Sequence, residues 1–226
     1  MSGYKALSGN LFSRKFGGTT KGVADPFISG YFFGTFESLP TAVASSVPGI
    51  SAVNLIQAGL TSVTLPTANL NKTTLDGLGG NKWHVPAGID IGDTCSLKFV
   101  EMSGLPYFQL FHTWFNLIRD IRTGVSQLSS YSKEAYAANF IYAATTPNGS
   151  TIEFACYMTG MFPTKDPFDI YGGDITAIDK VDYEQEFSVD YVWVNDKWVK
   201  DKAATLIKSA ETGKSALIGS TPTIGI

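Results

Sequence analysis

The chain has 226 residues and a formal net charge of −3, and only 16% of its residues are charged, against roughly a quarter in typical globular domains. The negative balance excludes a protein that binds nucleic acid through its overall charge. Hydrophobic residues make up 44%, enough for the core of one all-β or α+β domain, and no apolar run reaches the roughly 18 residues of a membrane-spanning helix. Few charges and 13% aromatic residues fit an ordinary β-rich domain, and equally a protein whose surface is covered by partners.

The chain begins with a basic segment. Lys5, Arg14, Lys15 and Lys21 lie within residues 1–24, which contain no acidic residue. Glycine and serine are frequent there, so we expect a flexible basic N-terminal arm. A basic stretch followed by an apolar one, the pattern of a secretion signal, is missing, so we expect synthesis and assembly in a cytoplasm.

Several strands are predicted after this arm. Pro26–Phe36 is apolar on both faces, which predicts a buried strand. Leu55–Leu65 is a second predicted strand, and it gives way to a Gly/Asn-rich excursion at Pro66–Asn81. We expect Trp83–Val85 and Ile89–Ile91 to resume the sheet.

The clearest half-buried strand in the sequence is Thr94–Glu101. Cys95, Leu97 and Phe99 alternate there with polar residues, so these three side chains are predicted to point inward. Cys156 falls within another predicted strand. We therefore expect two buried thiols rather than a disulfide.

A helix rich in aromatic residues is predicted at Ser103–Gly124. Ser103 is the expected N-cap and Gly124 the expected stop, and Arg119 and Arg122 are expected in the last turn. The apolar arc of this helix is wide, so we expect the helix to lie between its own sheet and a second copy of the chain. The side chains predicted to contact that copy are Phe108, Phe111, Trp114, Phe115 and Ile118.

The C-terminal half of the chain is predicted to contain three more strands and a short helix. In order, these are a strand at Tyr136–Ala144, a turn at Pro147–Gly149, a strand at Thr151–Pro163, a loop at Thr164–Lys180, a strand at Tyr183–Asn195 and a helix at Lys202–Ala210. Alternation in the last strand places Phe187, Val189, Tyr191 and Trp193 inward and Glu184, Glu186, Ser188 and Asp190 outward.

The sequence predicts no catalytic, cofactor or metal site. His84 and His112 lack neighbouring residues at the spacing of a metal or catalytic site, so a packed or surface role is expected for both. The phosphate-loop pattern fails because Lys208 occupies the position of its first glycine, and a calcium-loop pattern fails because Ala177 occupies the position of its glutamate. We therefore expect a protein that is not an enzyme.

The charges are distributed unevenly along the chain. Eight acidic residues lie between Asp166 and Asp190, where Lys180 is the only basic residue. The N-terminal arm and the segment after Asn195 are basic by contrast. Opposite charges at different ends suit head-to-tail association, and scattered surface charge is the alternative.

The segment Thr151–Val194 resembles the C-terminal half of the tail tube proteins of contractile-tailed bacteriophages. The most recognisable piece is the strand end and turn Thr159–Thr164, with the sequence Thr-Gly-Met-Phe-Pro-Thr. Upstream, Ser62–Pro66 and Thr94–Glu101 follow in the order that this family uses. The resemblance covers residues 25–195.

This resemblance implies a mainly β (α+β) fold, in which two orthogonally packed antiparallel sheets form a sandwich or barrel flanked by one amphipathic helix. The resemblance places a tail-tube domain at 25–195. The flexible basic arm expected at residues 1–24 and the C-terminal extension expected at 196–226 depart from the shorter family members. Six copies would close into a ring with a shared inner β-barrel, and rings would stack into a tube. The implied partners are other copies, tail sheath and baseplate proteins, and DNA that only passes through the lumen, with no membrane and no cofactor.

On this basis the expected function is that of a structural tail tube subunit in the virion, a conduit for DNA ejection. A baseplate, tube-initiating or secretion-system ring protein is the related alternative, and a monomeric β-sandwich enzyme or binding module is the alternative of another class. Glu184, Glu186 and Asp190 are expected to line the lumen, or else to meet the basic arm of an adjacent ring. Lys5, Arg14, Lys15 and Lys21 of that arm, and the Pro66–Asn81 excursion, are expected to reach the next ring.

Overall fold

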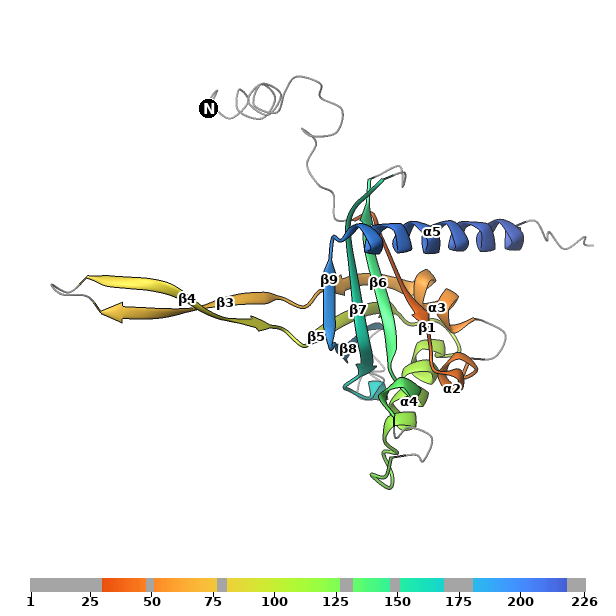
Figure 1. Ribbon diagram of the computed structural model, residues 1–226. Coiled ribbons are helices and arrows are strands. Elements are labelled where there is room, and N and C mark those ends of the chain that lie inside the picture. Colours follow the sequence, from red (N-terminus) through yellow and green to blue (C-terminus); the bar gives the residue numbers. More distant parts are fainter. Residues whose placement is uncertain are drawn as a thin grey trace, which may run out of the picture.

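The computed structural model of the protein describes residues 30–47, 51–76, 81–126, 132–146, 151–168 and 181–218 (Figure 1). Its strands are β1 (Phe32–Ser38), β2 (Leu60–Thr64), β3 (Ala68–Asp76), β4 (Lys82–Ile91), β5 (Thr94–Val100), β6 (Ala138–Thr145), β7 (Ile152–Pro163), β8 (Asp182–Ser188) and β9 (Tyr191–Val194). Its helices are α2 (Thr41–Ala44), α3 (Ala52–Gly59), α4 (Pro106–Ile118), the 3-10 turn η2 (Lys133–Ala135) and α5 (Lys197–Ile218).

Seven of the strands form two antiparallel half-sheets that share β7. The strand order is β1-β6-β7-β8-β5-β2, and β9 pairs with the other side of β7. Gly160 has a positive φ of 67° within β7, and beyond it Phe162 and Pro163 pair with β8 instead of β6. We call β1, β6, β7 and β9 half-sheet A, and β8, β5 and β2 with the end of β7 half-sheet B.

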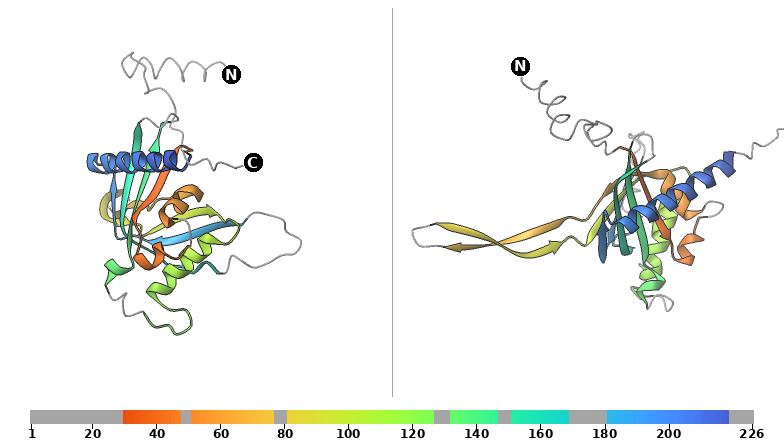
Figure 2. Two further views of the ribbon diagram at one scale, coloured as in Figure 1. Left: turned by 90° about the vertical axis from the view of Figure 1, so that its right-hand side faces the viewer. Right: turned by 45° about the horizontal axis from the view of Figure 1, so that its top comes forward.

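The prediction of a mainly β fold with two antiparallel sheets is confirmed. In the left view of Figure 2, β8 runs across the direction of β6 and β7. The described residues form no closed barrel, and four α-helices are present among them instead of the single flanking helix that was expected.

The core lies between the two half-sheets and is largely aromatic. Phe36 of β1 contacts the rings of Trp114, Phe140 and Phe187 at centroid distances of 5.4, 4.9 and 5.7 Å. These four side chains are fully buried and come from both half-sheets and α4. The core therefore fixes α4 against the sheets.

Helix α4 begins later than predicted, and Ser103 is not its N-cap. The N-cap is Leu105, in the left-handed region with φ 52°. The carboxylate of Glu101 accepts hydrogen bonds from the backbone N–H groups of Tyr107 (3.2 Å) and Phe108 (3.0 Å), so a side chain four residues before the N-cap satisfies the free donors of the first turn.

The helix also ends earlier than predicted, at Ile118. Arg119 is extended, with φ −153°, so Arg119 and Arg122 lie beyond the last turn. The chain turns directly after the helix, and the Oδ1 of Asn116 stabilises this turn by accepting a hydrogen bond from the N–H of Ile121 (3.1 Å). Gly124 has a positive φ of 66°, but it lies in the turn that follows and not at the helix end.

The predicted strand at Leu55–Leu65 is wrong in its first half, which belongs to helix α3. Ala52, Leu55, Ile56 and Gly59 are buried at helical spacing, and this short pattern overlaps the apolar run of β2. The hydroxyl of Tyr107 donates to the carbonyl of Leu55 (2.8 Å) and joins α3 to α4.

The predicted excursion at Pro66–Asn81 and the strands expected to resume the sheet after it are instead one long β-hairpin. β3 and β4 pair with each other in a separate two-stranded sheet, and every residue in both strands is exposed. The hairpin continues the β2–β5 pair, where the N–H of Gly92 donates to the carbonyl of Thr67 (2.7 Å). It projects far from the rest of the molecule (Figure 1), and we call it the hairpin arm.

The predicted final strand is broken in two. Phe187 and Val189 are buried as expected, but Tyr191 (68% exposed) and Trp193 (37% exposed) do not point into the core. The reason is a bend at Asp190, after which β9 joins half-sheet A beside β7. Strict alternation therefore stops at this bend.

The short helix expected at Lys202–Ala210 is the middle of α5, which covers the outer face of half-sheet A. Val199 and Ala203 pack there against Ile141, Ala143 and other small side chains. Strands β6 and β7 of half-sheet A are consequently covered on both faces, by the main core on one side and by α5 on the other, whereas β9 at the edge stays exposed.

Several predictions concern residues outside the described part of the chain. These are the N-terminal arm at residues 1–24, the turn at Pro147–Gly149 and most of the loop at Thr164–Lys180.

Candidate assembly surfaces

Half-sheet B has one face in the core and one in water. Along β8, Tyr183, Gln185 and Phe187 are buried, whereas Glu184 and Glu186 are exposed. The strand pairing adds the outward residues of β5 and β2 to the same surface. This surface, the polar face, consists of Ser62, Thr64, Thr94, Ser96, Lys98, Asp182, Glu184 and Glu186.

The polar face is negative and hydrated. Lys98 Nζ lies 3.1 Å from the carboxylate of Glu184, and both side chains are about half exposed, so this ion pair stabilises little. Glu186 lies opposite Ser96 and accepts a hydrogen bond from the hydroxyl of Thr164 (3.2 Å). Three carboxylates against one ammonium group leave the face with a net negative charge.

Asp190 does not belong to this face. It lies at the bend between β8 and β9, where its carboxylate is 2.5 Å from Nζ of Lys133. The same carboxylate lies directly over Gly160, so close that a Cβ atom there would be 2.1 Å from it. The structure thus brings Glu184 and Glu186 together and places Asp190 at the bend that joins the half-sheets.

The five aromatic and aliphatic side chains predicted on the inter-subunit face of α4 divide into two groups. Phe111 and Trp114 are fully buried in the chain's own core, so they cannot contact a second copy. Phe108, Phe115 and Ile118 are half-buried, and we call these three the α4 outer row.

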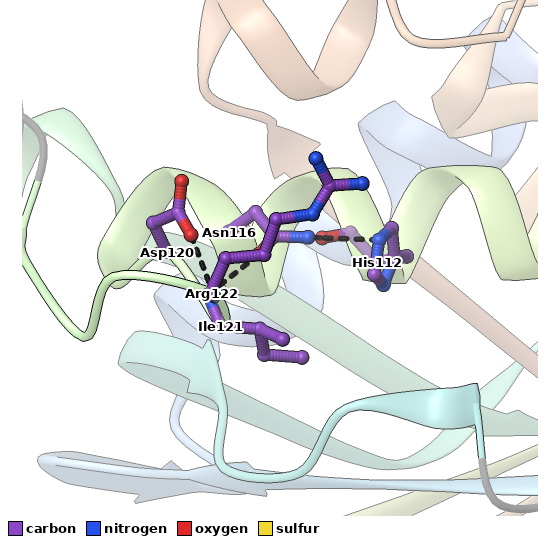
Figure 3. Close-up of a pocket in the computed structure, with 5 residues that line it drawn as sticks. All are labelled: His112, Asn116, Asp120, Ile121 and Arg122. Atoms are coloured by element: carbon purple, nitrogen blue, oxygen red, sulfur yellow. Dashed lines mark hydrogen bonds between the residues drawn. The ribbon is translucent and has the colours of Figure 1, made fainter.

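A pocket lies on the same side of α4, and His112, Asn116, Asp120, Ile121 and Arg122 line it (Figure 3). Nδ1 of His112 lies 2.7 Å from Oδ2 of Asp166, which is 7% exposed. Nδ2 of Asn116 lies 2.9 Å from Nε2 of His112. The imidazole is thus bonded on both nitrogens.

This pairing is structural. Because the Asp166 carboxylate only accepts, Nδ1 of His112 donates to it, and Nε2 accepts from the Asn116 amide. A catalytic base needs that second nitrogen free for substrate or nucleophile. The His112–Asp166 bond instead ties α4 to the segment that follows β7. Sequence reasoning did not pair these two residues because they lie 54 positions apart.

Gln185 is a second buried polar side chain that the sequence analysis did not single out. Its Nε2 donates to the carbonyl of Lys165 (2.8 Å), and its Oε1 accepts from the hydroxyl of Tyr183. Gln185 lies between the outward residues Glu184 and Glu186, so strand alternation alone would have predicted that its side chain points inward.

Cys95 and Cys156 are free and buried, which confirms the prediction of buried thiols. Burial raises the pKa of Cys95 to about 12, with a further contribution from Cys156, and raises the pKa of Cys156 to about 11. Among the residues that the structure describes, no group of three or more His, Cys, Asp or Glu side chains could hold a metal ion. None of the described helices is both long and apolar enough to cross a membrane.

No protein-family model and no curated protein matches the sequence. Among solved structures, the chain is similar to a chain of the anti-feeding prophage cap, the AFP tube terminating cap (15% identity, 76% of this chain and 91% of that chain, TM-score 0.48). It is similar to a chain of the sheath-tube complex of PVC, an extracellular contractile injection system in its extended state (16%, 75% and 91%, 0.46). It is also similar to a chain of the AFP baseplate (12%, 75% and 95%, 0.48).

Proposed function

We propose that the protein is a structural subunit that assembles with copies of itself into hexameric rings, and that the rings stack into a phage tail tube through which DNA is ejected. The observation that carries this proposal is the difference between the two half-sheets. The β6–β7 pair of half-sheet A is covered on both faces, by the core and by α5, and only its edge strand β9 carries exposed aromatic side chains, whereas half-sheet B is buried on one face and carries the negative polar face on the other. Half-sheet B is therefore the part of the described chain suited to line a water-filled lumen.

A shared barrel would use the free ends of the sheet. The strand order ends at β2 on one side, in half-sheet B. An unpaired edge strand invites pairing with another chain, and closure of sheets between subunits removes such edges. Six copies joined in this way would turn the polar face toward a common axis.

The α4 outer row supports a lateral contact between subunits. Phe108, Phe115 and Ile118 are only half-buried in the isolated chain, and Leu105 (43% exposed) and Ile121 (46% exposed) extend this apolar strip at the two ends of the helix. Burial of apolar side chains is the main favourable term in association.

The negative polar face suits a channel that passes DNA without holding it. Carboxylates such as Glu184 and Glu186 repel phosphates, and the lysine of this face, Lys98, is paired with Glu184, so release of counterions would favour binding little. For Asp190 and this acidic row, the alternative remains a contact with the basic N-terminal arm of an adjacent ring. Sheath and baseplate proteins are the proposed outer partners, in a virion tail assembled in the host cytoplasm.

The proposal is tested by the assembly state of the purified full chain, measured by size-exclusion chromatography with light scattering and by negative-stain electron microscopy. Long hollow tubes are the expected result. Rings that stop at one layer would favour a baseplate, tube-initiating or secretion-system ring protein. A monodisperse monomer at all concentrations would contradict the proposal and favour a β-sandwich binding module or enzyme.

A further inference from the structure

The hairpin arm carries large apolar side chains that nothing in its own strands covers. Leu70, Trp83, Ile89 and Ile91 are 63–68% exposed, and Leu75 is 50% exposed. A lone two-stranded hairpin is marginally stable in water. An exposed apolar ribbon of this length therefore marks a binding surface.

The apolar residues change faces of the ribbon at a β-bulge. Near the base, Leu70 pairs with Ile89, and near the tip, Leu75 pairs with Trp83. Leu70 and Leu75 are an odd number of residues apart, so they lie on opposite faces of β3. β4 has one extra residue between these two pairs, at the bulge. As a result Ile89 shares the face of Leu70, and Trp83 shares the opposite face with Leu75.

The ribbon also turns over along its length. In Figure 1, β3 and β4 cross near the middle of the arm and exchange places between base and tip. Two-stranded ribbons are strongly twisted, so such a crossing is expected. Because the residue pattern changes faces where a two-stranded ribbon twists strongly, we infer that the base and tip residues face a common side of the arm. The arm thus presents one long apolar side.

A second exposed apolar surface lies where β9 meets α5. We call Tyr191, Trp193 and Trp198 the aromatic surface, and these side chains are 37–68% exposed. The ring of Trp193 lies 6.1 Å from that of Tyr191 and 5.9 Å from that of Trp198. Buried Tyr157 supports both tryptophans from below, at 6.1 and 5.3 Å.

We propose that the hairpin arm of one copy binds the aromatic surface of a second copy. The arm projects away from its own body, so a copy does not cover its own aromatic surface (Figures 1 and 2). β3 and β4 have 9 and 10 exposed residues, and about half of them lie on the apolar side, so this contact would be one of several joints that a stable assembly needs. Tryptophan and tyrosine are enriched among the residues that carry most of the binding energy at interfaces. The arm supplies Trp83, and the aromatic surface supplies Tyr191, Trp193 and Trp198.

Because the contact joins two unlike surfaces, it can repeat head to tail and so generate rings or continuous stacks. It rests on the proposed self-assembly and adds to it a second joint, separate from the α4 outer row. The aromatic surface is the better receiver because its side chains are exposed, whereas those of the α4 outer row are already half-buried in their own subunit.

Site-specific cross-linking of the full chain tests this contact. Leu75→Cys copies and Asp201→Cys copies are prepared separately, mixed during assembly and treated with a short bifunctional thiol reagent. Asp201 is exposed on α5, three residues after Trp198 and so beside it on the helix. Both substitutions keep Trp83 and the aromatic rings in place. The matched control replaces Leu75→Cys by Thr74→Cys, since Thr74 is exposed on the opposite face, where it bonds His84. The two native thiols, Cys95 and Cys156, are buried, so we expect them to react little with the cross-linking reagent.

The proposal predicts several-fold more cross-linked dimer for Leu75→Cys with Asp201→Cys than for Thr74→Cys with Asp201→Cys. Equal yields would overturn it, as would a dimer of Leu75→Cys copies alone, which indicates arm-to-arm pairing. A cross-link from Leu75→Cys to Ile121→Cys would move the receiver to α4 and also overturn it. If particles assemble but the predicted cross-link is missing, this contact is wrong and the proposed function still stands. If the chain never assembles, the proposed function is wrong as well.

Discussion

Glu101 shows how one side chain can fix a helix end that local sequence rules misplace. Its carboxylate binds the first N–H groups of α4, near the positive end of the helix dipole, and the predicted cap at Ser103 is not used. The rules for N-caps consider the adjacent residue, whereas here the chain makes a turn between Glu101 and Pro106 and brings a more distant acceptor to the helix. That turn depends on Gly104 and Leu105, which both have positive φ.

Replacement of this carboxylate should therefore destabilise the protein, and replacement of the predicted cap should not. We expect Glu101→Ala to lower the free energy of unfolding by about 0.5–2 kcal/mol, the usual value for loss of a capping side chain. Ser103→Ala, the matched control on an exposed side chain, should change it by less than about 0.5 kcal/mol. Urea denaturation of both variants measures this, and equal losses would assign the cap to both residues or to neither.

Gly160 is the residue on which the bend between the half-sheets depends. It has φ +67°, and a Cβ atom would lie 2.1 Å from the Asp190 carboxylate that pairs with Lys133. We expect Gly160→Ala to cost about 1–3 kcal/mol from backbone strain alone, with a further loss from the displaced carboxylate. Gly88→Ala, at a site where a Cβ would meet nothing within 4 Å, is the control for denaturation measurements. Unchanged stability of Gly160→Ala would show that β7 bends without a left-handed residue.

At the scale of elements, the attachment of α5 depends on a small ionic group. Lys202 Nζ donates to the carboxylate of Glu37 (2.8 Å), the hydroxyl of Tyr157 donates to the same carboxylate (2.7 Å), and Lys202 lies over the Tyr157 ring at 4.5 Å. Partial burial raises the pKa of Glu37, but the hydrogen bonds from Lys202 and Tyr157 and the charge of Lys202 outweigh it and lower the pKa below 4.5. Partial burial likewise lowers the pKa of Lys202, and the same bonds raise it above 10.5.

The directions of these shifts set the pH range in which this group stabilises the fold. A carboxylate with a lowered pKa stabilises the folded state above its ordinary value and loses that effect as the pH falls through the folded value. An ammonium group with a raised pKa stabilises below its ordinary value and loses that effect at high pH. We therefore expect the melting temperature of the wild type to fall below about pH 4.5, and above about pH 10.5, more steeply than that of Glu37→Gln. Parallel curves for the two proteins in thermal melts would contradict this account of the α5 attachment.

The sequence predicted those elements whose residues alternate against one continuous core. β5 was predicted because Cys95, Leu97 and Phe99 alternate with polar residues and all point into that core. β7 was predicted from the same alternation, in Ile152, Phe154, Cys156 and Met158. The hairpin arm was missed because none of its residues is buried, so hydrophobic alternation does not indicate which strands pair there. Helix α3 was missed because its eight residues share apolar positions with the strand that follows.

The candidate surfaces were likewise predicted where a strand is regular and missed where tertiary structure decides. Glu184 and Glu186 lie on one face, as the alternation of β8 predicts, because this strand is regular along its length. Asp190 is not on that face because the chain bends at this residue, and its carboxylate lies against Gly160 of another strand, a contact that no local pattern indicates. The pairing of His112 with Asp166 depends on tertiary structure alone, so no local pattern indicates it.

For the whole molecule, the distribution of charge leads to a test of the lumen. Glu184→Lys with Glu186→Lys would change the polar face from net negative to net positive without altering the buried side of β8. Tubes of this variant should retain duplex DNA, and retention should weaken steeply as salt rises, since binding then depends on counterion release. Electrophoretic mobility of assembled tubes mixed with DNA, at several salt concentrations, measures this.

The matched control reverses two acidic residues on the opposite side of the molecule, Glu153→Lys with Asp201→Lys, which are exposed beside α5. If the polar face lines the lumen, only the first variant holds DNA inside the tube, where added nuclease does not reach it. Equal retention and equal nuclease sensitivity in the two variants would place the polar face on the outside. Loss of stacking in the first variant alone would instead favour the contact between this acidic row and the basic N-terminal arm of the next ring, because reversed charges would then repel across that joint.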